Sequence, residues 1–405
     1  MSVNTLNFEQ VSTILTSLVK QATGQTVLTA TDTGSFTSVA QILLKADRDS
    51  VMNAISNMVG KTIFSIRPYS AKFTGLMMDS FRWGAMMRKL SIVDSDLEND
   101  AGYDYPVFYD ANQNPADGYG LSVDQWKIKK PHVLQTNFYG QSVYGDHVTI
   151  TEEQLETAFS GPDQLGSFLS LIMTDLSNRL EQSNETLRRG IVANAIASLY
   201  DENNSDRVVH LLTEYNTLTG ITPALTTQTV YDPANFPAFM KWVYSRIAQI
   251  SDMFTERSTK FQTTITGSPV LRHTPKQDQR IYLYAPARHQ IDARVLADTF
   301  HDSYLRYSDV ETVNYWQSIN TPDQINALGA YTDTAGVLKT TGTAINVQDV
   351  FGIIFDRDFM GMTVLGEKTL ATPVNASGLY RNLWVHCRRR CLMDNTEKAA
   401  ILLLD

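Results

Sequence analysis

The feature that most constrains the fold is an apolar stripe between residues 163 and 200. Large apolar side chains recur there every three or four positions, which is the spacing of one face of an α-helix. An unbroken helix of this length spans on the order of 55 Å at about 1.5 Å per residue. Because only one face is apolar, we expect the helix to lie across a core as a beam. The stripe consists of Leu165, Phe168, Leu169, Ile172, Leu176, Leu180, Leu187, Ile191, Ala195 and Leu199.

The residues before this helix carry start and stop signals. Thr151 and Gln154 form a capping box that predicts a short first helix. Gly161-Pro162 then breaks the chain, so the short helix and the long one are predicted to be separate elements.

The second half of the chain mixes helices and strands. Helices are predicted over residues 236–254, with Asp232 as the cap, and over RHQIDARVLADTF. Strands are predicted in RIYLYAP, at 313–316, at 350–355 and in LYRNLWVHCRRRCLM. We therefore expect an α+β fold, and the length of 405 residues suggests two or three structural units.

The N-terminal segment reads as an arm. Apolar residues between Phe8 and Val19 follow helical spacing and do not resemble a signal peptide. The Thr-, Ser- and Gly-rich stretch 24–38 predicts a flexible or extended connection, and a second helix is predicted over 46–58. Apolar runs stay well short of the roughly 18 residues that a membrane helix needs.

Residues 94–145 predict a long two-stranded excursion. DSDLENDAGYDYPVFYDANQNPADGYG contains seven acids and no base, whereas the return half carries Lys127, Lys129 and Lys130. Trp126 and Ile128 alternate with lysines, as on a half-exposed strand. A polar hairpin of roughly 50 residues is poorly stable alone, so we expect it to lean on something else.

Motifs for catalysis or metal binding are incomplete. GKT at 60–62 lacks the earlier glycine of a phosphate loop, because Ile55 stands there. The acids around Asp96 alternate like calcium ligands, but Ala101 and Val107 occupy the positions of the required Gly and Glu. The seven histidines are scattered. A hydrolase site assembled from distant residues remains an alternative.

Both cysteines lie in WVHCRRRC, residues 384–391. On a strand, Cys387 and Cys391 are about 13 Å apart, too far for a disulfide, and zinc would lack ligands. Alternation predicts inward thiols, interrupted by Arg389, with Arg388 and Arg390 on the opposite face. We expect these two arginines to pair with carboxylates across an interface. Contact with DNA phosphates is the alternative, although the net charge of -9 argues against general polyanion binding.

The order of these parts resembles the major capsid proteins of tailed bacteriophages, which share the Hong Kong 97-type fold, and most of all those of small short-tailed phi-29-like phages. The segments that carry the resemblance are FYGQSVYGDHVTITEEQLETAF, GSFLSLIMTDLSNRL, RHQIDARVLADTF after RIYLYAP, and FDRDFMGMTVLGEKTLATPVNASGLYRNLWVHCRRRC.

The resemblance implies a division of the chain. The implied parts are an N-terminal arm over 1–60, a first part of the peripheral domain over 61–94, an extended loop hairpin over 95–148, the peripheral domain with a spine helix over 149–205, an axial domain over 206–349, and C-terminal peripheral strands over 350–405.

It also implies a virion protein without enzymatic activity or cofactor. Such a chain is made in the host cytoplasm and self-assembles into hexamers and pentamers of an icosahedral or prolate shell around double-stranded DNA. Expected partners are further copies, a separate scaffolding protein, a portal and DNA bound without sequence specificity, with no membrane. A portal or tail component is the nearest alternative. The subunit-interface candidates are Asp96, Glu98, Asp100, Asp104, Trp126, Lys127, Lys129, Lys130, Arg388 and Arg390.

Overall fold

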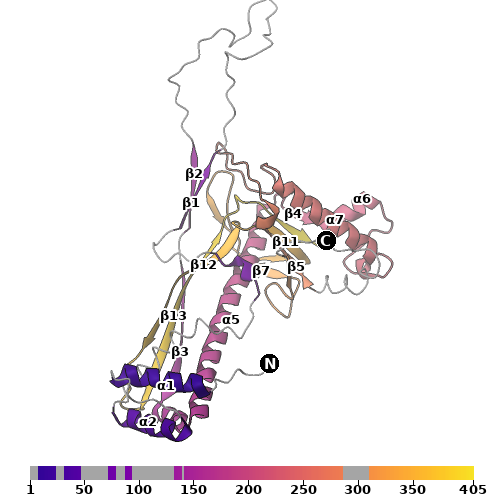
Figure 1. Ribbon diagram of the computed structural model, residues 1–405. Helices are drawn as coiled ribbons and strands as arrows, with labels where there is room; N and C mark the ends of the chain where they lie inside the picture. Colours follow the sequence, from indigo (N-terminus) through magenta and orange to yellow (C-terminus); the bar gives the residue numbers. More distant parts are fainter. Residues whose placement is uncertain are drawn as a thin grey trace, which may run out of the picture.

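The computed structural model describes residues 8–23, 32–46, 72–78, 87–93, 132–138, 141–285 and 310–405. Its long axis is helix α5, Pro162–Glu202, whose 41 residues span about 60 Å (Figure 1). The extended Gly161 precedes Pro162 at the first helical position, and Asn203 ends the helix in the left-handed conformation. The predicted beam is therefore confirmed.

The stripe of α5 enters two hydrophobic cores. Leu165 and Leu176, in its first half, are fully buried in a core with the N-terminal helices. Val192, Ile196 and Leu199, in its second half, are fully buried in another core. The helix therefore ties two structural units together: its first half buries one face, whereas residues 191–199 are buried on nearly every side.

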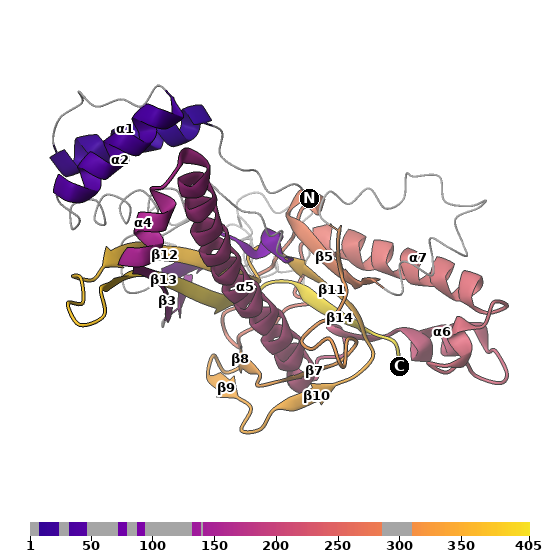
Figure 2. The ribbon, with the colours of Figure 1, turned by 90° about the horizontal axis from the view of Figure 1, so that it is seen from below.

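The first unit is a long antiparallel sheet covered by helices. The sheet has the strand order β12-β13-β3, and β13 and β3 run alongside α5 (Figure 1). Helices α1 and α2 lie next to each other near the start of α5 (Figure 2). The elements are α1 (Phe8–Thr23), α2 (Thr33–Ala46), β3 (Ser142–Thr151), α4 (Glu152–Ala158), β12 (Met360–Ala371) and β13 (Tyr380–Met393).

The second unit is a mixed sheet between helices, with the strand order β4-β14-β11-β5-β6. Successive side chains of its central strands point to opposite faces. Ile353 and Ile401 pack in the core that contains the second half of α5, whereas Ile354 and Leu402 pack in a third core with α6 and α7. The elements are β4 (Val208–His210), α6 (Leu211–Thr219), α7 (Phe236–Thr255), β5 (Gln279–Tyr284), β6 (Val310–Val313), β11 (Val350–Asp356) and β14 (Ala399–Leu403).

Two short pairs of antiparallel strands pack against the second half of α5. Trp316 is buried beside them and donates its indole N–H to the Val350 carbonyl at 2.8 Å. Strand β7 pairs with β10, and β8 pairs with β9. The elements are β7 (Ile325–Ala327), β8 (Ala330–Thr332), β9 (Leu338–Thr340), β10 (Ile345–Val347), and the 3-10 turns η1 (Thr74–Leu76), η2 (Thr229–Tyr231) and η3 (Lys276–Asp278).

A two-stranded ribbon projects from the body (Figure 1). Strand β1, Met87–Ile92, pairs antiparallel with β2, Val133–Phe138, so that Ile92 lies opposite Val133. This ribbon is the base of the predicted hairpin. It begins before residue 95, and residues 142–148 belong to β3 instead.

Several local predictions are confirmed. The Thr151 amide donates to the Gln154 side-chain oxygen and the Gln154 amide donates to the Thr151 hydroxyl, both at 3.3 Å, so the capping box forms. The strands in RIYLYAP, at 350–355 and in LYRNLWVHCRRRCLM correspond to β5, β11 and β13.

Other local predictions are wrong. Residues 33–38 belong to α2 rather than to a flexible or extended connection, because Phe36, Val39 and Ala40 supply a helical face to the first core. Asp232 does not cap α7 with its side chain; its carbonyl accepts the Phe236 amide at 3.0 Å. The strand predicted at 313–316 lies at 310–313.

Two predicted helices fall largely or wholly outside the description. Of the one over 46–58, only Ala46 is described, and it is the last residue of α2. Residues 286–309, which contain all of RHQIDARVLADTF, lie outside the described residues.

Truncating the buried stripe is expected to destabilise the first unit. Leu176→Ala should lower the free energy of unfolding by about 2–5 kcal/mol, because Leu176 is 0% exposed and a cavity remains. Leu171→Ala on the same helix is the matched control: Leu171 is 70% exposed, so the change should stay within about 0.5 kcal/mol. Denaturant unfolding followed by circular dichroism measures both, and equal losses would contradict the assignment.

Candidate functional site

The site lies at the turn between β13 and β14, where the base of the hairpin meets the body. The turn is polar but buried, since its members are at most 5% exposed: Asp394, Asn395, Thr396, Glu397 and Lys398. The Asp394 carboxylate accepts the Thr396 amide at 3.0 Å and the Thr396 hydroxyl at 2.6 Å. These bonds fix a tight turn and leave charged groups facing the ribbon.

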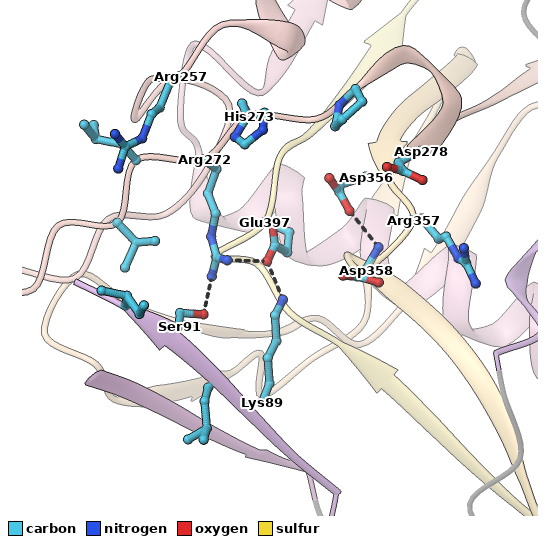
Figure 3. A pocket seen from close by; sticks show the side chains of 15 residues that line it. Lys89, Ser91, Arg257, Arg272, His273, Asp278, Asp356, Arg357, Asp358 and Glu397 are labelled. Atoms are coloured by element: carbon cyan, nitrogen blue, oxygen red, sulfur yellow. Dashed lines mark hydrogen bonds and ion pairs between the residues drawn. The ribbon is translucent and has the colours of Figure 1, made fainter. Parts of the chain in front are cut away.

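Strand β1 reaches this turn through side chains on one of its faces. The Lys89 ammonium lies 2.8 Å from Asp394 Oδ2 and also pairs with Glu397. Arg272 lies 2.8 Å from Glu397 Oε1 and donates to the Ser91 hydroxyl at 2.9 Å (Figure 3). We call Lys89, Arg272, Asp394 and Glu397 the hairpin anchor.

The pKa values show how burial and pairing compete in the hairpin anchor. Burial acts to lower the pKa of Lys89, but Asp394 and Glu397 outweigh it and the pKa is raised. Burial acts to raise the pKa of Asp394, but Lys89 and Thr396 outweigh it and the pKa is lowered. For Glu397, burial raises the pKa despite Lys89 and Arg272. Lys89 and Asp394 are therefore a charged pair at neutral pH.

Two further cations connect the same turn to the helices. Arg207 is fully buried, pairs with Glu202 at 2.8 Å and donates to the Asn395 carbonyl at 3.0 Å; burial lowers its pKa to about 10. The Lys398 ammonium donates to the Glu256 carbonyl at 2.6 Å, and burial lowers its pKa to about 8. The turn is thus held from the end of α5 and from the end of α7.

A crevice of about 890 Å³ lies beside the hairpin anchor (Figure 3). It is lined by residues 89–92 of β1, by the segment 270–273 and by the turn 356–358, among others. Asp356, on the body side, accepts the Thr274 hydroxyl at 2.5 Å, and burial raises its pKa. Within the described part of the chain, no cluster of His, Cys, Asp and Glu could hold a metal ion. The arrangement orients strand β1 relative to the body.

The arginines of WVHCRRRC have separate environments. Arg388 is exposed, as predicted. Arg389 is buried, pairs with Glu367 and donates to the Asn184 side-chain oxygen at 3.1 Å. Arg390 is only 3% exposed, so its predicted display on the surface is wrong. Its position on β13 lies opposite the fully buried Thr363 of β12, where the sheet enters the body.

The two cysteines are free thiols. Cys387 is buried and Cys391 is half-buried. Burial raises the pKa of each to about 11, so both stay protonated at neutral pH. Protonated thiols are poor nucleophiles and poor metal ligands.

The hairpin candidates lie outside the described residues: Asp96, Glu98, Asp100, Asp104, Trp126, Lys127, Lys129 and Lys130. The sequence reasoning missed the hairpin anchor. The sequence MDNTEK between two apolar strands indicates a turn. Nothing local indicates that this turn is buried against a strand about 300 residues earlier.

Breaking the buried ion pair between Glu367 and Arg389 is expected to destabilise the fold strongly. Glu367→Gln should lower the free energy of unfolding by about 3–5 kcal/mol, because it leaves Arg389 buried without a counter-charge. Asp252→Asn breaks the exposed Lys276 pair and should cost about 0–1 kcal/mol. Chemical unfolding of both variants tests the difference, which would be refuted by a Glu367→Gln loss no larger than that of the control.

The described helices include none long and apolar enough to cross a membrane. No match was found among curated protein sequences. Two solved structures are similar in fold. A chain of the capsid structure of Staphylococcus phage Andhra is 10% identical, with a TM-score of 0.52, 83% of this chain covered and 84% of that one. A chain of the structure of the head fiber and inner core protein gp22 of native bacteriophage P68 is 11% identical, with a TM-score of 0.51, 83% of this chain covered and 85% of that one.

A family model described as Phi29-like phage major capsid protein matches residues 13–403. That match covers nearly the whole chain, and the mixed helix-and-sheet structure is similar to the Hong Kong 97-type fold of tailed-phage capsid proteins. The chain therefore belongs to the Phi29-like phage major capsid protein family and is a shell-forming protein of a bacteriophage virion.

Proposed function

We propose that the chain assembles as hexamers and pentamers into an icosahedral or prolate head shell around double-stranded DNA, with each hairpin laid on a neighbouring copy. The observation that carries the proposal is the ribbon β1–β2, which projects from the body (Figure 1). Its apolar side chains Leu90, Ile92 and Val133 are 58%, 69% and 54% exposed. Apolar side chains grouped on a projecting ribbon are typical of a surface that another chain covers.

Side chains on the two faces of β1 have different roles: one face contacts the body and the other is free. Lys89 and Ser91 point to the body, whereas Leu90 and Ile92 lie on the other face, and Val133 of β2 lies opposite Ile92. A two-stranded ribbon is marginally stable alone. Burial of its free face against a neighbouring copy would supply the missing stabilisation, at about 25 cal/mol per Å² of apolar surface.

The charges of the hairpin would set the register between copies. The acidic half carries Asp96, Glu98, Asp100 and Asp104, and the return half carries Lys127, Lys129 and Lys130. Complementary charges contribute to specificity and to the rate of association more than to affinity. Arg388, exposed on β13, is proposed to meet a carboxylate of a neighbouring copy.

We propose the domain division implied by the resemblance, with two changes. The hairpin is assigned to begin with β1, before residue 95, and to end before β3, which starts at residue 142. Strands β11 and β14 pair with β5 and β4. Residues 350–356 and 399–403 are therefore assigned to the axial domain, and β12 and β13 to the peripheral domain. The arm over 1–60 would include α1 and α2.

The partners beyond further copies of the chain are also proposals. A separate scaffolding protein is favoured because α1 and α2 pack into the first core, which leaves them unavailable as an independent scaffolding domain. A portal, and synthesis in the host cytoplasm, are proposed from the family. The net charge of -9 suits a shell that confines DNA without binding it tightly.

A role without catalysis is proposed in place of the hydrolase alternative. His273 lines the crevice together with Asp278, Asp356 and Asp358. Asp356 instead accepts bonds from Thr274 and from the Asp358 amide, and the described contacts include no bond from His273 to any of these carboxylates. Detectable ester or phosphoester hydrolysis that His273→Ala abolishes would contradict this assignment.

Removing the tip of the hairpin is expected to block assembly. Deletion of residues 100–120 should leave a soluble, folded monomer, because the three hydrophobic cores of the described residues lie elsewhere in the chain. Shells should be absent by electron microscopy, while circular dichroism and size-exclusion chromatography report the folded monomer. Intact shells from the deletion variant would exclude the proposed role of the hairpin.

Reversing one half of the hairpin charges is expected to block assembly, and reversing both halves to restore it. Lys127→Glu, Lys129→Glu and Lys130→Glu together should abolish shells, since acid then faces acid. Adding lysine at 96, 98, 100 and 104 in the same chain should recover them. Lys339→Glu, on an exposed side chain of β9, is the matched control and should assemble normally. The proposal fails if the combined reversal assembles no better than the lysine reversal alone.

The proposed contact of Arg388, on the exposed face of β13, can be tested in the same assembly assay. Arg388→Glu should reduce shell yield without changing the unfolding midpoint, because the side chain is exposed in the single chain. Unchanged yield would remove Arg388 from the interface.

A further inference from the structure

The ribbon β1–β2 is attached to the body in an unusual way. The three hydrophobic cores formed by the described residues contain members of α5, of both larger sheets and of five other helices, but they contain no residue of β1 or β2. The ribbon therefore lacks the apolar attachment that holds the other long elements.

Charged contacts take its place. Lys89 pairs with Asp394 and Glu397, and Arg272 connects Glu397 to Ser91. Glu397 is shared, because it receives one cation from the ribbon and one from the body segment before η3 (Figure 3). Such bonds are directional, so they fix the orientation of a strand. Their net stabilisation is small, because desolvation of the charges offsets much of the attraction.

Space for movement lies beside the hairpin anchor. The crevice of about 890 Å³ separates residues 89–92 from the turn 356–358 of the body. A strand packed by apolar side chains would fill such a space, whereas here Lys89 extends from β1 toward Glu397 (Figure 3). The ribbon can change its angle to the body without opening any of the three cores.

We propose that the hairpin anchor is a releasable latch that sets the direction of the hairpin, with Glu397 as the group that links ribbon to body. When Glu397 loses its two cations, the ribbon pivots as a unit about its base while both sheets stay intact. The charged groups that face the latch are Lys89 from β1, Arg272 from the segment before η3, Asp394 from the turn, and Asp356 from the end of β11. This inference deepens the proposed function, in which the hairpin meets a neighbouring copy.

A distance measurement within one chain tests the latch. Spin labels are placed at Gln135→Cys on β2 and Thr259→Cys after α7, both exposed positions, in a Cys391→Ala background; Cys387 is fully buried. Pulsed electron spin resonance on the unassembled full-length protein should give one narrow distance distribution. Glu397→Gln and Lys89→Met should each shift it to a broader or second population, whereas Lys89→Arg should keep the narrow one.

A matched control separates release of the latch from general loosening. Glu214→Gln breaks the Arg246–Glu214 pair between α6 and α7, on the other side of the body, and should leave the distribution unchanged. A narrow, unshifted distribution in both Glu397→Gln and Lys89→Met, with the circular dichroism of the parent, would overturn the proposal. Should either variant fail to fold, Arg272→Gln, which removes the body-side cation from Glu397 together with the bond to Ser91, replaces it and is held to the same outcome.

The readout is independent of assembly. Label distances that depend on Glu397, in a protein that forms no shells, would refute the proposed function and leave the latch standing. Shells of normal yield, together with label distances that do not change in Glu397→Gln, would refute the latch and leave the proposed function standing.

Discussion

The apolar face of α5 must be buried along its whole length, and no single core in this fold is long enough to cover it. Leu176 and Leu199 on the same stripe consequently lie in different cores. One core is built against the sheet β12-β13-β3 and the other against the five-stranded sheet. A continuous helix transmits any tilt of one unit to the other, because bending it would break its own hydrogen bonds. The subunit therefore consists of two packed units that are joined rigidly by α5.

Polar residues make a further connection between the units. The chain passes from one sheet to the other through the turn 394–398, which is buried yet carries no apolar side chain. Its groups bind Arg207 near the end of α5, Thr263 after α7 and Lys89 of the ribbon. Directional bonds of this kind fix angles between units, whereas apolar contacts mainly hold units together. In this fold, apolar contacts hold the helices and sheets together, and directional polar bonds at the turn 394–398 fix their relative orientation.

Regular, local patterns were readable in the sequence. The stripe of α5 and the box formed by Thr151 and Gln154 depend only on spacing within one segment, and both are confirmed. Alternation along β13 correctly placed Cys387 inward and Arg388 outward. The burial of Arg390 was not readable, because it depends on what the rest of the chain places over the end of the sheet.

The remaining misses have the same physical origin. Residues 33–38 look polar and small, yet Phe36, together with Val39 and Ala40 that follow, gives α2 enough apolar contact to join the first core. The hairpin anchor joins positions about 300 residues apart, so no local window contains both partners. Recognition of the overall order of parts succeeded where residue-level reasoning about these contacts could not, since order survives when individual contacts change.

The place of β14 in the five-stranded sheet determines when the subunit can fold during its synthesis. Residues 399–403 form a central strand between β4 and β11, with both faces buried. The sheet cannot close until this segment has left the ribosome, although α5 emerges about 200 residues earlier with its apolar face uncovered. Contacts between such distant segments form slowly, and the exposed surface is prone to aggregation in the meantime. Incomplete chains therefore lack the strand that completes the cores on both faces of this sheet, and the subunit can finish folding only after its synthesis has passed residue 403.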